Sequence, residues 1–464
     1  MNNSSLFSAI SIPLAAGKRA KEITEAIVYM ICKDNFPLNI VEGKGFLKLM
    51  KSVVPHFKVP SRKTIRKLIN CKYEVESEKM KNEIKATENY SLTTDIWTES
   101  GNTISYLGLT VHYLKNGSFK AGILVISELR SNHTAEYLRN VIQGLCKEWY
   151  IDLNKVVSVV TDNGMKDLFG EEKHLSCFAH CIHLVATAGL SKVPDVQAII
   201  GKVKTIVTFF KHSVVASDKL RQLQIDHGIA PNDVLKLRKD VPTRWNSTYF
   251  MTDRFIALSN YVGSVLLQNP HSPPMLSGYE LDVLREFRTV LSPLEQITRE
   301  LIGQKYVTIS LVIPLLNCLQ TCLTGQIRET GEARSLSKSL INELKLRFLD
   351  TESNKLYAVS TLLDPRFKYL HFRDSTALTR AINEVDQSLR SSSEESIQER
   401  GISSNYEMNP NDIWSHHNSL MAKDGSINEE SDTSLELRHT VFLAQRPHER
   451  NEDPLKVWSS IAAV

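Results

Sequence analysis

Residues 90 to 161 constrain the fold more than any other part of the chain, because short strand-like segments alternate there with turns. Three segments are rich in β-branched and aromatic residues: 90–97, 103–114 and 119–129. Turns that contain Gly and Asn separate these segments. An amphipathic pattern over 133–148 then predicts a helix, and 155–161 predicts a buried strand. Three antiparallel strands, a helix and a further buried strand are typical of an α/β fold with a mixed sheet.

The regions on either side of this segment have helical patterns. Apolar residues recur at helical spacing over 18–33, and Ser61 after Pro60 is a candidate N-cap for the next helix. The region 172–380 is mostly helical, with periodic runs at 174–190, 195–212, 281–303 and 309–323. We therefore expect a small helical N-terminal domain over 18–85 and a long helical region after the first strands.

The charge of the chain is distributed unevenly. The 464 residues contain 56 Lys and Arg and 52 Asp and Glu, for a net charge of +4. Between Lys44 and Tyr73, however, there are nine Lys or Arg and no acid, whereas residues 391–436 contain ten acids and two Lys or Arg. The acidic composition of 391–435, poor in apolar residues, predicts a disordered loop.

The basic window carries the strongest signal for a partner. Its candidate DNA-binding residues are Lys58, Arg62, Lys63, Arg66 and Lys67, and the last four recur at helical spacing and predict a continuous stripe. Such a stripe suits contacts with the phosphate backbone, although a run of charges is more often only a solvated face.

The composition excludes several classes of protein. With 42% hydrophobic and 23% charged residues, the chain is neither wholly disordered nor histone-like. No stretch has the ~18 apolar residues of a membrane span, so no membrane partner is expected. Seven irregularly spaced cysteines do not form a disulfide framework and favour a reducing compartment, the nucleus or the cytosol.

Two carboxylates lie at the ends of predicted strands. Asp95 comes near the end of the first strand, and Asp162 directly follows the strand 155–161. Carboxylates at the ends of neighbouring strands can share a divalent cation. The alternative is that Asp162-Asn163-Gly164 is simply a turn, since all three are turn residues.

Three further motifs have both a functional and a structural interpretation. Cys177 and His180 share one face of a predicted helix, but their spacing is not that of a zinc finger, so no zinc is predicted. Arg244 could contact phosphate and Trp245 could stack on a base; alternatively Trp245 anchors a helix in the core and Arg244 pairs with Asp240. Residues 364–368 predict a turn followed by a basic surface stretch.

Six motifs in a fixed order resemble those of hAT-superfamily transposases, and most closely those of the zinc finger BED domain-containing proteins. They are Thr94-Asp95-Ile96-Trp97-Thr98, Thr161-Asp162-Asn163-Gly164, Cys177-Phe178-Ala179-His180, Thr243-Arg244-Trp245-Asn246-Ser247, Leu363-Asp364-Pro365-Arg366-Phe367-Lys368 and Asp453-Pro454-Leu455-Lys456-Val457-Trp458. The likeness extends from about residue 20 to the C-terminus.

The resemblance implies a ribonuclease-H-like fold: a mixed sheet interrupted by a large all-α insertion, with DNA as the partner. It places the first part of that domain at 88–190, the insertion at 191–385 and the start of a C-terminal dimerisation region at 436–464.

By the same resemblance, Asp95, Asp162 and Glu436 would be the catalytic acids of an active member. Together they would bind Mg²⁺ or Mn²⁺. A second alignment puts Arg438 at the third position in place of Glu436. Cys177, His180, Arg244 and Trp245 match positions near the active site and the flanking DNA.

The chain also departs from the family pattern. Several residues are missing after Asp162-Asn163-Gly164, no Cys-x-x-Cys pair of a BED finger precedes residue 20, and the dimerisation region stops at Val464. We therefore expect a transposase-derived, nuclear DNA-binding or regulatory protein without catalytic activity. The alternatives are an active DNA transposase and an interaction module that dimerises with itself or with a full-length relative.

Overall fold

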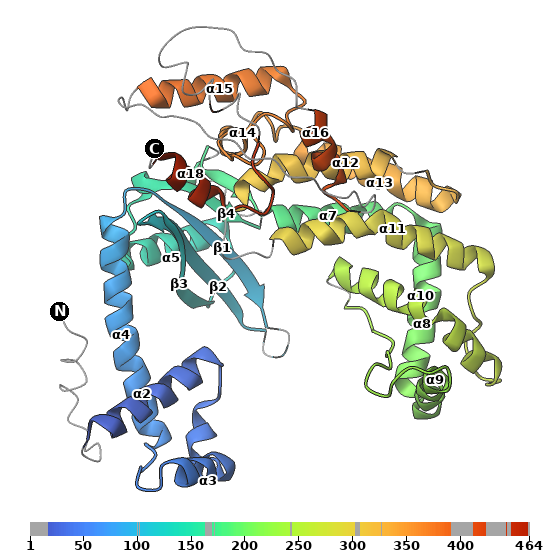
Figure 1. Ribbon diagram of the computed structural model, residues 1–464, viewed down its shortest axis with the longest axis horizontal. Coiled ribbons are helices and arrows are strands. Elements are labelled where there is room, and N and C mark those ends of the chain that lie inside the picture. Colours follow the sequence, from blue (N-terminus) through green and yellow to red (C-terminus); the bar gives the residue numbers. More distant parts are fainter. Residues whose placement is uncertain are drawn as a thin grey trace. The chain divides into compact units, whose positions relative to one another are not determined.

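The computed structural model (Figure 1) describes most of the chain, in two compact units. The described residues are 17–99, 101, 103–162, 169–170, 172–241, 244–301, 307–325, 327–390, 412–423, 442 and 447–462. The first unit comprises Met1–Glu88 and Asn140–Lys155, and the second Asn89–Arg139 and Val156–Val464. In the described residues, no helix is both long enough and apolar enough to span a membrane.

The N-terminal unit is helical, as its sequence pattern predicts. Its elements are α2 (Lys18–Lys33), the 3-10 helix η1 (Leu38–Glu42), α3 (Lys44–Val53), α4 (Arg62–Ala86) and the last turns of α5 (Ala135–Glu148). The predicted cap is confirmed, because the Ser61 hydroxyl accepts a hydrogen bond from the Thr64 amide at 3.3 Å. A small core joins α2, η1 and α4 through Ile27, Val28, Ile31, Val41, Ile65 and Leu68.

The predicted mixed sheet is confirmed in the second unit. It comprises β1 (Tyr90–Thr98), β2 (Ser105–Lys115), β3 (Ser118–Leu129), β4 (Val156–Thr161) and β5 (His174–Ser176), in the order β3-β2-β1-β4-β5. β1 pairs antiparallel with β2 and parallel with β4. The β2–β3 hairpin turns at Asn116 and Gly117, whose φ angles of 50° and 68° suit these two residue types.

One predicted helix begins later than its apolar pattern indicates. The run 174–190 predicts a helix throughout, but His174–Ser176 forms β5 and the helix α7 covers Phe178–Ser191. The reason is tertiary: β5 pairs parallel with β4, and the Thr161 hydroxyl lies 2.8 Å from His174 Nε2. A short apolar run does not by itself distinguish a strand from a helical turn.

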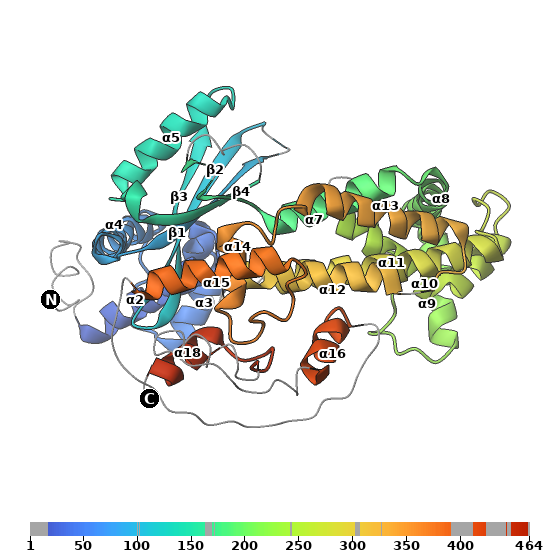
Figure 2. The same cartoon turned by 90° about the horizontal axis from the view of Figure 1, so that it is seen from above.

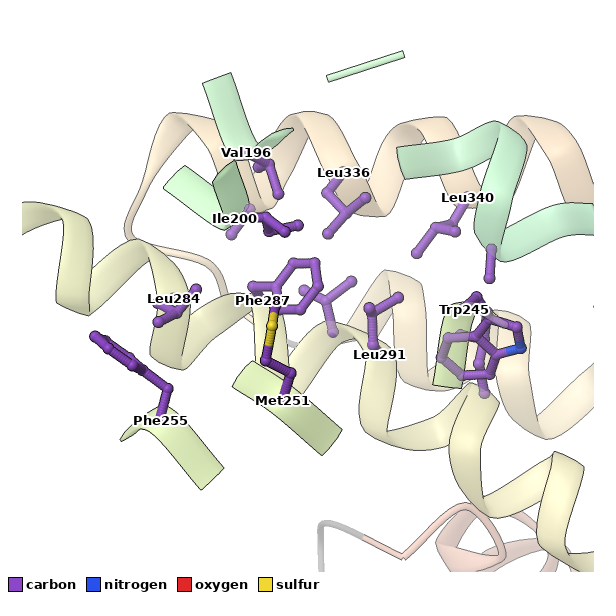
Figure 3. Close-up of a cluster of buried hydrophobic side chains, with 14 of the residues drawn as sticks. Val196, Ile200, Trp245, Met251, Phe255, Leu284, Phe287, Leu291, Leu336 and Leu340 are labelled. Atoms are coloured by element: carbon purple, nitrogen blue, oxygen red, sulfur yellow. The ribbon is translucent and has the colours of Figure 1, made fainter. Parts of the chain in front are cut away.

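The helices that follow (Figure 2) form one large apolar core, part of which Figure 3 shows. They are α7, α8 (Pro194–His212), α9 (Val214–Asp226), α10 (Trp245–Leu267), α11 (Gly278–Leu301), η3 (Ile309–Leu311), α12 (Val312–Gly325) and α13 (Gly331–Phe348). Helix α7 passes very close to α13 at Gly189, where an added Cβ would lie 2.5 Å from Leu340 Cδ2. Two further helices, α14 (Lys355–Leu362) and α15 (Ser375–Arg390), pack on each other through a separate apolar cluster.

Two sequence interpretations are corrected near the C-terminus. Residues 364–368 are not a basic surface stretch, because Asp364, Arg366, Phe367 and Lys368 are all buried. The segment 391–435 is not disordered throughout, because residues 412–423 are described and contain α16 (Ser415–Lys423). The physical reason is common to both: the Trp414 ring stacks on the Phe367 ring with centroids 5.8 Å apart, and this contact holds the start of α16.

The last helix, α18 (Pro454–Ala462), is attached to the same motif. The Trp458 indole donates a hydrogen bond to the Leu363 carbonyl at 2.9 Å, and the Lys368 ammonium donates to the Phe442 carbonyl. The segment 363–368 therefore forms a buried hub that holds three short C-terminal segments against the helices.

Candidate functional site

The structure brings Asp95 of β1 and Asp162, the residue after β4, together where the parallel pairing of these two strands ends. Thr93 of β1 pairs with Val160 of β4. Asp95 comes two residues after Thr93, and Asp162 comes two residues after Val160. Because side chains two residues apart lie on the same face of a sheet, both carboxyl groups lie on one face. Burial, the main cause, raises the pKa of Asp95, and the nearby charge of Asp162 and hydrogen bonding between the two carboxyl groups act in the same direction.

The first turn of α7 completes this group. His180 Nδ1 lies 3.8 Å from an Asp162 carboxylate oxygen, and its charge partly offsets the rise in the pKa of Asp95. Cys177 is the N-cap residue of α7 and forms a hydrogen bond with Asp162, while burial raises the pKa of its thiol. The Cys177 amide donates to the Thr161 carbonyl at 2.8 Å, which fixes the start of α7 beside the end of β4.

A pocket of about 520 Å³ opens in front of the two acids. Its lining includes three apolar side chains that sequence reasoning missed: Trp97 is 40% exposed, Ile123 67% and Ile126 57%. Gly108 makes room for the indole, because a Cβ there would lie 3.1 Å from Trp97 Cζ3. The pocket thus offers a planar apolar surface beside two carboxylates. The sequence signal that could have identified Trp97 as a pocket residue is its position two residues after Asp95, on the same face of β1.

The donor set of the acid pair suits a hard divalent cation. Carboxylate oxygens are the ligands that Mg²⁺ and Mn²⁺ prefer, and a cation between Asp95 and Asp162 would relieve their repulsion. Within the described residues, no three potential metal ligands lie together. Glu436, the predicted third acid, and Arg438, its alternative, lie outside the described residues. Of the three predicted carboxylates, Asp95 and Asp162 are therefore the two whose positions the structure describes.

The basic stripe lies in the N-terminal unit, on the first turns of α4. Arg62, Lys63, Arg66 and Lys67 are all exposed, and Lys58 is exposed in the preceding loop. Beneath them, Ile65 and Leu68 are buried in the core of the unit. Within the described part of the chain, none of the five cations forms an ion pair, whereas Arg19 pairs with Glu22 and Lys79 pairs with Glu76 elsewhere in this unit.

The motif around Trp245 has a structural role that corrects its predicted contact with a base. The Trp245 side chain is only 6% exposed and belongs to the helical core (Figure 3), so its ring offers almost no surface on which a base could stack. Arg244 is exposed at the N-cap of α10. The alternative ion pair is also wrong, because Asp240 pairs with Lys204 at 2.8 Å.

Comparison with known proteins agrees with this geometry. Residues 93–173 match the model of the ZBED1 RNase-like domain, and residues 175–277 match that of the ZBED1 RNase-like helical domain. The boundary between the two matches falls at β5, where the sheet gives way to helices.

Three relatives illustrate the similarity. The chain is 25% identical over 374 residues to zinc finger BED domain-containing protein 4 of Homo sapiens, covering 77% of this chain and 31% of that protein. It is 26% identical over 372 residues to a putative AC transposase of Zea mays, covering 73% and 44%. It is 23% identical over 410 residues to the putative transcriptional regulator tpeD of Talaromyces stipitatus, covering 79% and 46%. The chain therefore spans less than half the length of each.

Proposed function

Because the chain is a hAT-derived, BED-type protein, we propose that it binds double-stranded DNA as a nuclear regulator and no longer cleaves strands. The observation that carries DNA binding is the exposed basic stripe of α4, whose cations have no carboxylate partner among the described residues. Cations without a protein partner are available to phosphates, and each phosphate contact releases a counterion from the duplex.

Two observations support the proposal that the protein is a regulator and no longer cleaves DNA. One relative carries the name of a transcriptional regulator and another that of a BED domain-containing protein. In addition, the resemblance to the hAT pattern implies that several residues are missing directly after Asp162-Asn163-Gly164. Metal chemistry tolerates displacements of only about 0.5 Å in its ligands, so a deletion beside a ligand is expected to weaken it.

Charge reversal on α4 tests DNA binding. In the Lys63→Glu/Arg66→Glu/Lys67→Glu variant, we expect affinity for a duplex to fall by about two orders of magnitude at about 0.15 M salt. The slope of log affinity against log salt should also become shallower by about three, because three phosphate contacts are lost. Fluorescence anisotropy of a labelled duplex over a salt series measures both quantities.

A matched control has the same change in charge at exposed positions outside the stripe. The Lys18→Glu/Lys33→Glu/Lys85→Glu variant should bind within about threefold of the wild type, because nonspecific repulsion at long range is screened. If the wild type does not bind DNA, the proposal is wrong. Equal losses in both variants would assign the effect to net charge, and an interaction module would then be the better description.

The approach of Asp95 to Asp162 favours a second candidate function, metal-dependent DNA strand cleavage. Asp95 and Asp162 would hold the ion, which would stabilise charge on the attacking and leaving oxygens when bound. His180, at 3.8 Å from Asp162, would help to fix the orientation of that carboxylate.

A cleavage assay with Mg²⁺ or Mn²⁺ separates the two candidates. Under our proposal, the wild type and the Asp162→Ala variant give the same background of DNA nicks. Asp195→Ala, at an exposed position on α8, serves as the matched control. Metal-dependent product from the wild type and Asp195→Ala, but not from Asp162→Ala, would replace the regulator with an active transposase-type enzyme.

A further inference from the structure

A second pocket, of about 350 Å³, lies in the helical part of the second unit. It opens where α10, α11 and α12 meet (Figure 2), and it shares no lining residue with the pocket beside the acids. Most of its lining is polar and comes from two helices: Tyr249 and Asp253 of α10, and Arg288, Thr289, Ser292 and Pro293 of α11.

Helical spacing places these residues together on one side of each helix. Tyr249 and Asp253 are four residues apart and share a face of α10, whereas Met251 between them belongs to the apolar core (Figure 3). The four residues of α11 share a face in the same way, and Leu291 of that helix belongs to the core (Figure 3). Tyr249 and Cys322, which also lines the pocket, pack against this core, so the floor of the pocket consists of packed side chains.

Two of the lining residues carry opposite charges and are only loosely paired. Arg288 Nη1 lies 3.4 Å from Asp253 Oδ1, and the two side chains are 43% and 47% exposed. Charge-assisted hydrogen bonds of this kind are ordinarily about 2.7–2.9 Å long. One turn earlier on α11, Arg285 pairs with Asp282 at 2.6 Å. The Arg288–Asp253 pair therefore leaves both partners with capacity to bind a ligand.

A chain of hydrogen bonds makes the Tyr249 hydroxyl a donor. Gln296 Nε2 donates to Ser292 Oγ at 3.2 Å. The Ser292 hydroxyl forms a hydrogen bond with the Tyr249 phenol that favours the phenolate, which is the effect of a donor. Burial is the larger effect and raises the pKa of Tyr249, so the phenol keeps its proton near neutral pH. Because its oxygen accepts from Ser292, the phenol can donate its own proton to a ligand.

A proline inside α11 supplies an acceptor beside these donors. Pro293 has no amide hydrogen, so the Thr289 carbonyl does not receive the hydrogen bond that position 293 provides in a regular helix. Both residues line the pocket. The pocket therefore combines two donors, the guanidinium of Arg288 and the phenol of Tyr249, with two acceptors, the carboxylate of Asp253 and the Thr289 carbonyl.

We propose that this pocket binds a small zwitterion, a free α-amino acid. The carboxylate of the ligand accepts from Arg288 and Tyr249, and its ammonium donates to Asp253 and to the Thr289 carbonyl. A purely anionic ligand is repelled by Asp253 and a purely cationic one by Arg288, whereas a zwitterion replaces one long ion pair with two short ones. The volume is near the lower end of the range for ligand pockets, about 300–1,000 Å³, which suits a ligand of this size. The inference goes beyond DNA binding and does not rest on it.

The first test uses the full-length wild type and needs no variant. Each standard L-amino acid is titrated up to about 10 mM by isothermal titration calorimetry, and we expect saturable binding of at least one of them. The amide of that amino acid lacks the carboxylate, and its deaminated acid lacks the ammonium. Each analogue should bind at least about tenfold more weakly, because it loses hydrogen bonds to a charged group. Absence of binding by every amino acid, or equal binding of either analogue, overturns the proposal.

The second test assigns the binding to this pocket. Arg288→Gln and Asp253→Asn should each weaken binding of the amino acid by about 10- to 100-fold. Arg288→Gln should also bind the amino acid and its amide more equally, which a general loss of stability does not produce. The matched controls, Arg285→Gln and Asp282→Asn, break the exposed ion pair on the same helix and should stay within about twofold of the wild type. Circular dichroism without ligand checks that all four variants fold. Equal losses in the control and pocket variants would contradict the assignment.

Discussion

Replacing Asp364 with alanine is expected to lower the free energy of unfolding by about 3–5 kcal/mol, because it leaves a buried guanidinium without its counter-charge. Asp364 is 4% exposed and Arg366 6% exposed. The carboxylate accepts hydrogen bonds from Arg366 Nε at 2.9 Å and Arg366 Nη2 at 2.7 Å, in a bidentate pair. It also accepts from the Ser310 hydroxyl at 2.7 Å.

The loss of stability should extend to the C-terminal segments, because the turn that contains Asp364 and Arg366 also holds these segments. The Arg366 guanidinium donates to the Arg450 carbonyl at 3.3 Å, and the His448 amide donates to the Pro365 carbonyl at 2.8 Å. We therefore expect faster proteolysis in the region 442–462 of the variant, together with reduced stability. Urea unfolding followed by tryptophan fluorescence measures the stability, since Trp414 stacks within this hub.

Two further variants show whether the ion pair is the cause. Asp218→Ala removes an exposed carboxylate of α9 and should change stability by no more than about 0.5 kcal/mol. Asp364→Leu/Arg366→Met removes both charges and should recover part of the loss, because no unpaired ion remains buried. Equal stability of Asp364→Ala and Asp218→Ala would show that the hub does not stabilise the fold.

Acidification from pH 6.5 to 4.5 is expected to destabilise the second unit by about 2 kcal/mol for each of two buried histidines. His371 and His417 are at most 2% exposed, and His371 Nε2 lies 2.9 Å from His417 Nδ1. Burial, the main cause, and the neighbouring cations lower the pKa of His417 to about 4 and lower the pKa of His371 still further. The other charged or titratable neighbours of the pair are His416, Arg366, Arg373, Arg450 and Asp364. Of these, only Asp364 raises a histidine pKa, that of His417.

The sign follows from proton binding in the two states. Below the ordinary histidine pKa of about 6.5 the unfolded chain takes up protons at both positions, whereas the folded protein stays neutral there. The stabilising contribution is therefore complete above pH 6.5 and is lost as the pH falls toward the lowered pKa of the folded state. Equilibrium unfolding at a series of pH values measures this loss.

A double substitution that keeps the hydrogen bond serves as the test. In the His371→Gln/His417→Asn variant, amide atoms lie near the positions of the two bonded ring nitrogens but do not titrate. The free energy of unfolding should therefore depend less on pH. His212→Gln, at an exposed position on α8, should keep the wild-type dependence. An unchanged pH dependence in the double variant would assign the acid sensitivity to other groups.

Much of the second unit's fold was predictable because its signals are local. The strands at 90–97 and 119–129 could be recognised from β-branched and aromatic residues, and the hairpin from Asn116-Gly117. The convergence of Asp95 and Asp162 also follows from strand order, since carboxyl ends of adjacent parallel strands meet at one edge of a sheet.

The features that sequence reasoning missed depend on contacts between distant segments. Trp97 was not assigned to the pocket, because its indole lies over Gly108, a residue of the neighbouring strand that leaves room for the ring.

The sequence by itself determined most of the elements, the order of the six motifs and the basic charge of α4, since each rests on residues that are neighbours in the chain. Only the tertiary structure decided which charged residues face water. Lys368 and Arg366 look like surface cations in sequence, yet they are buried because Asp364 and the Phe442 carbonyl supply their counter-groups. The cost of burying a charge depends on its partners. The partner of Arg366 lies two residues away in the chain, whereas the partner of Lys368 lies 74 residues away and is supplied only by the tertiary structure.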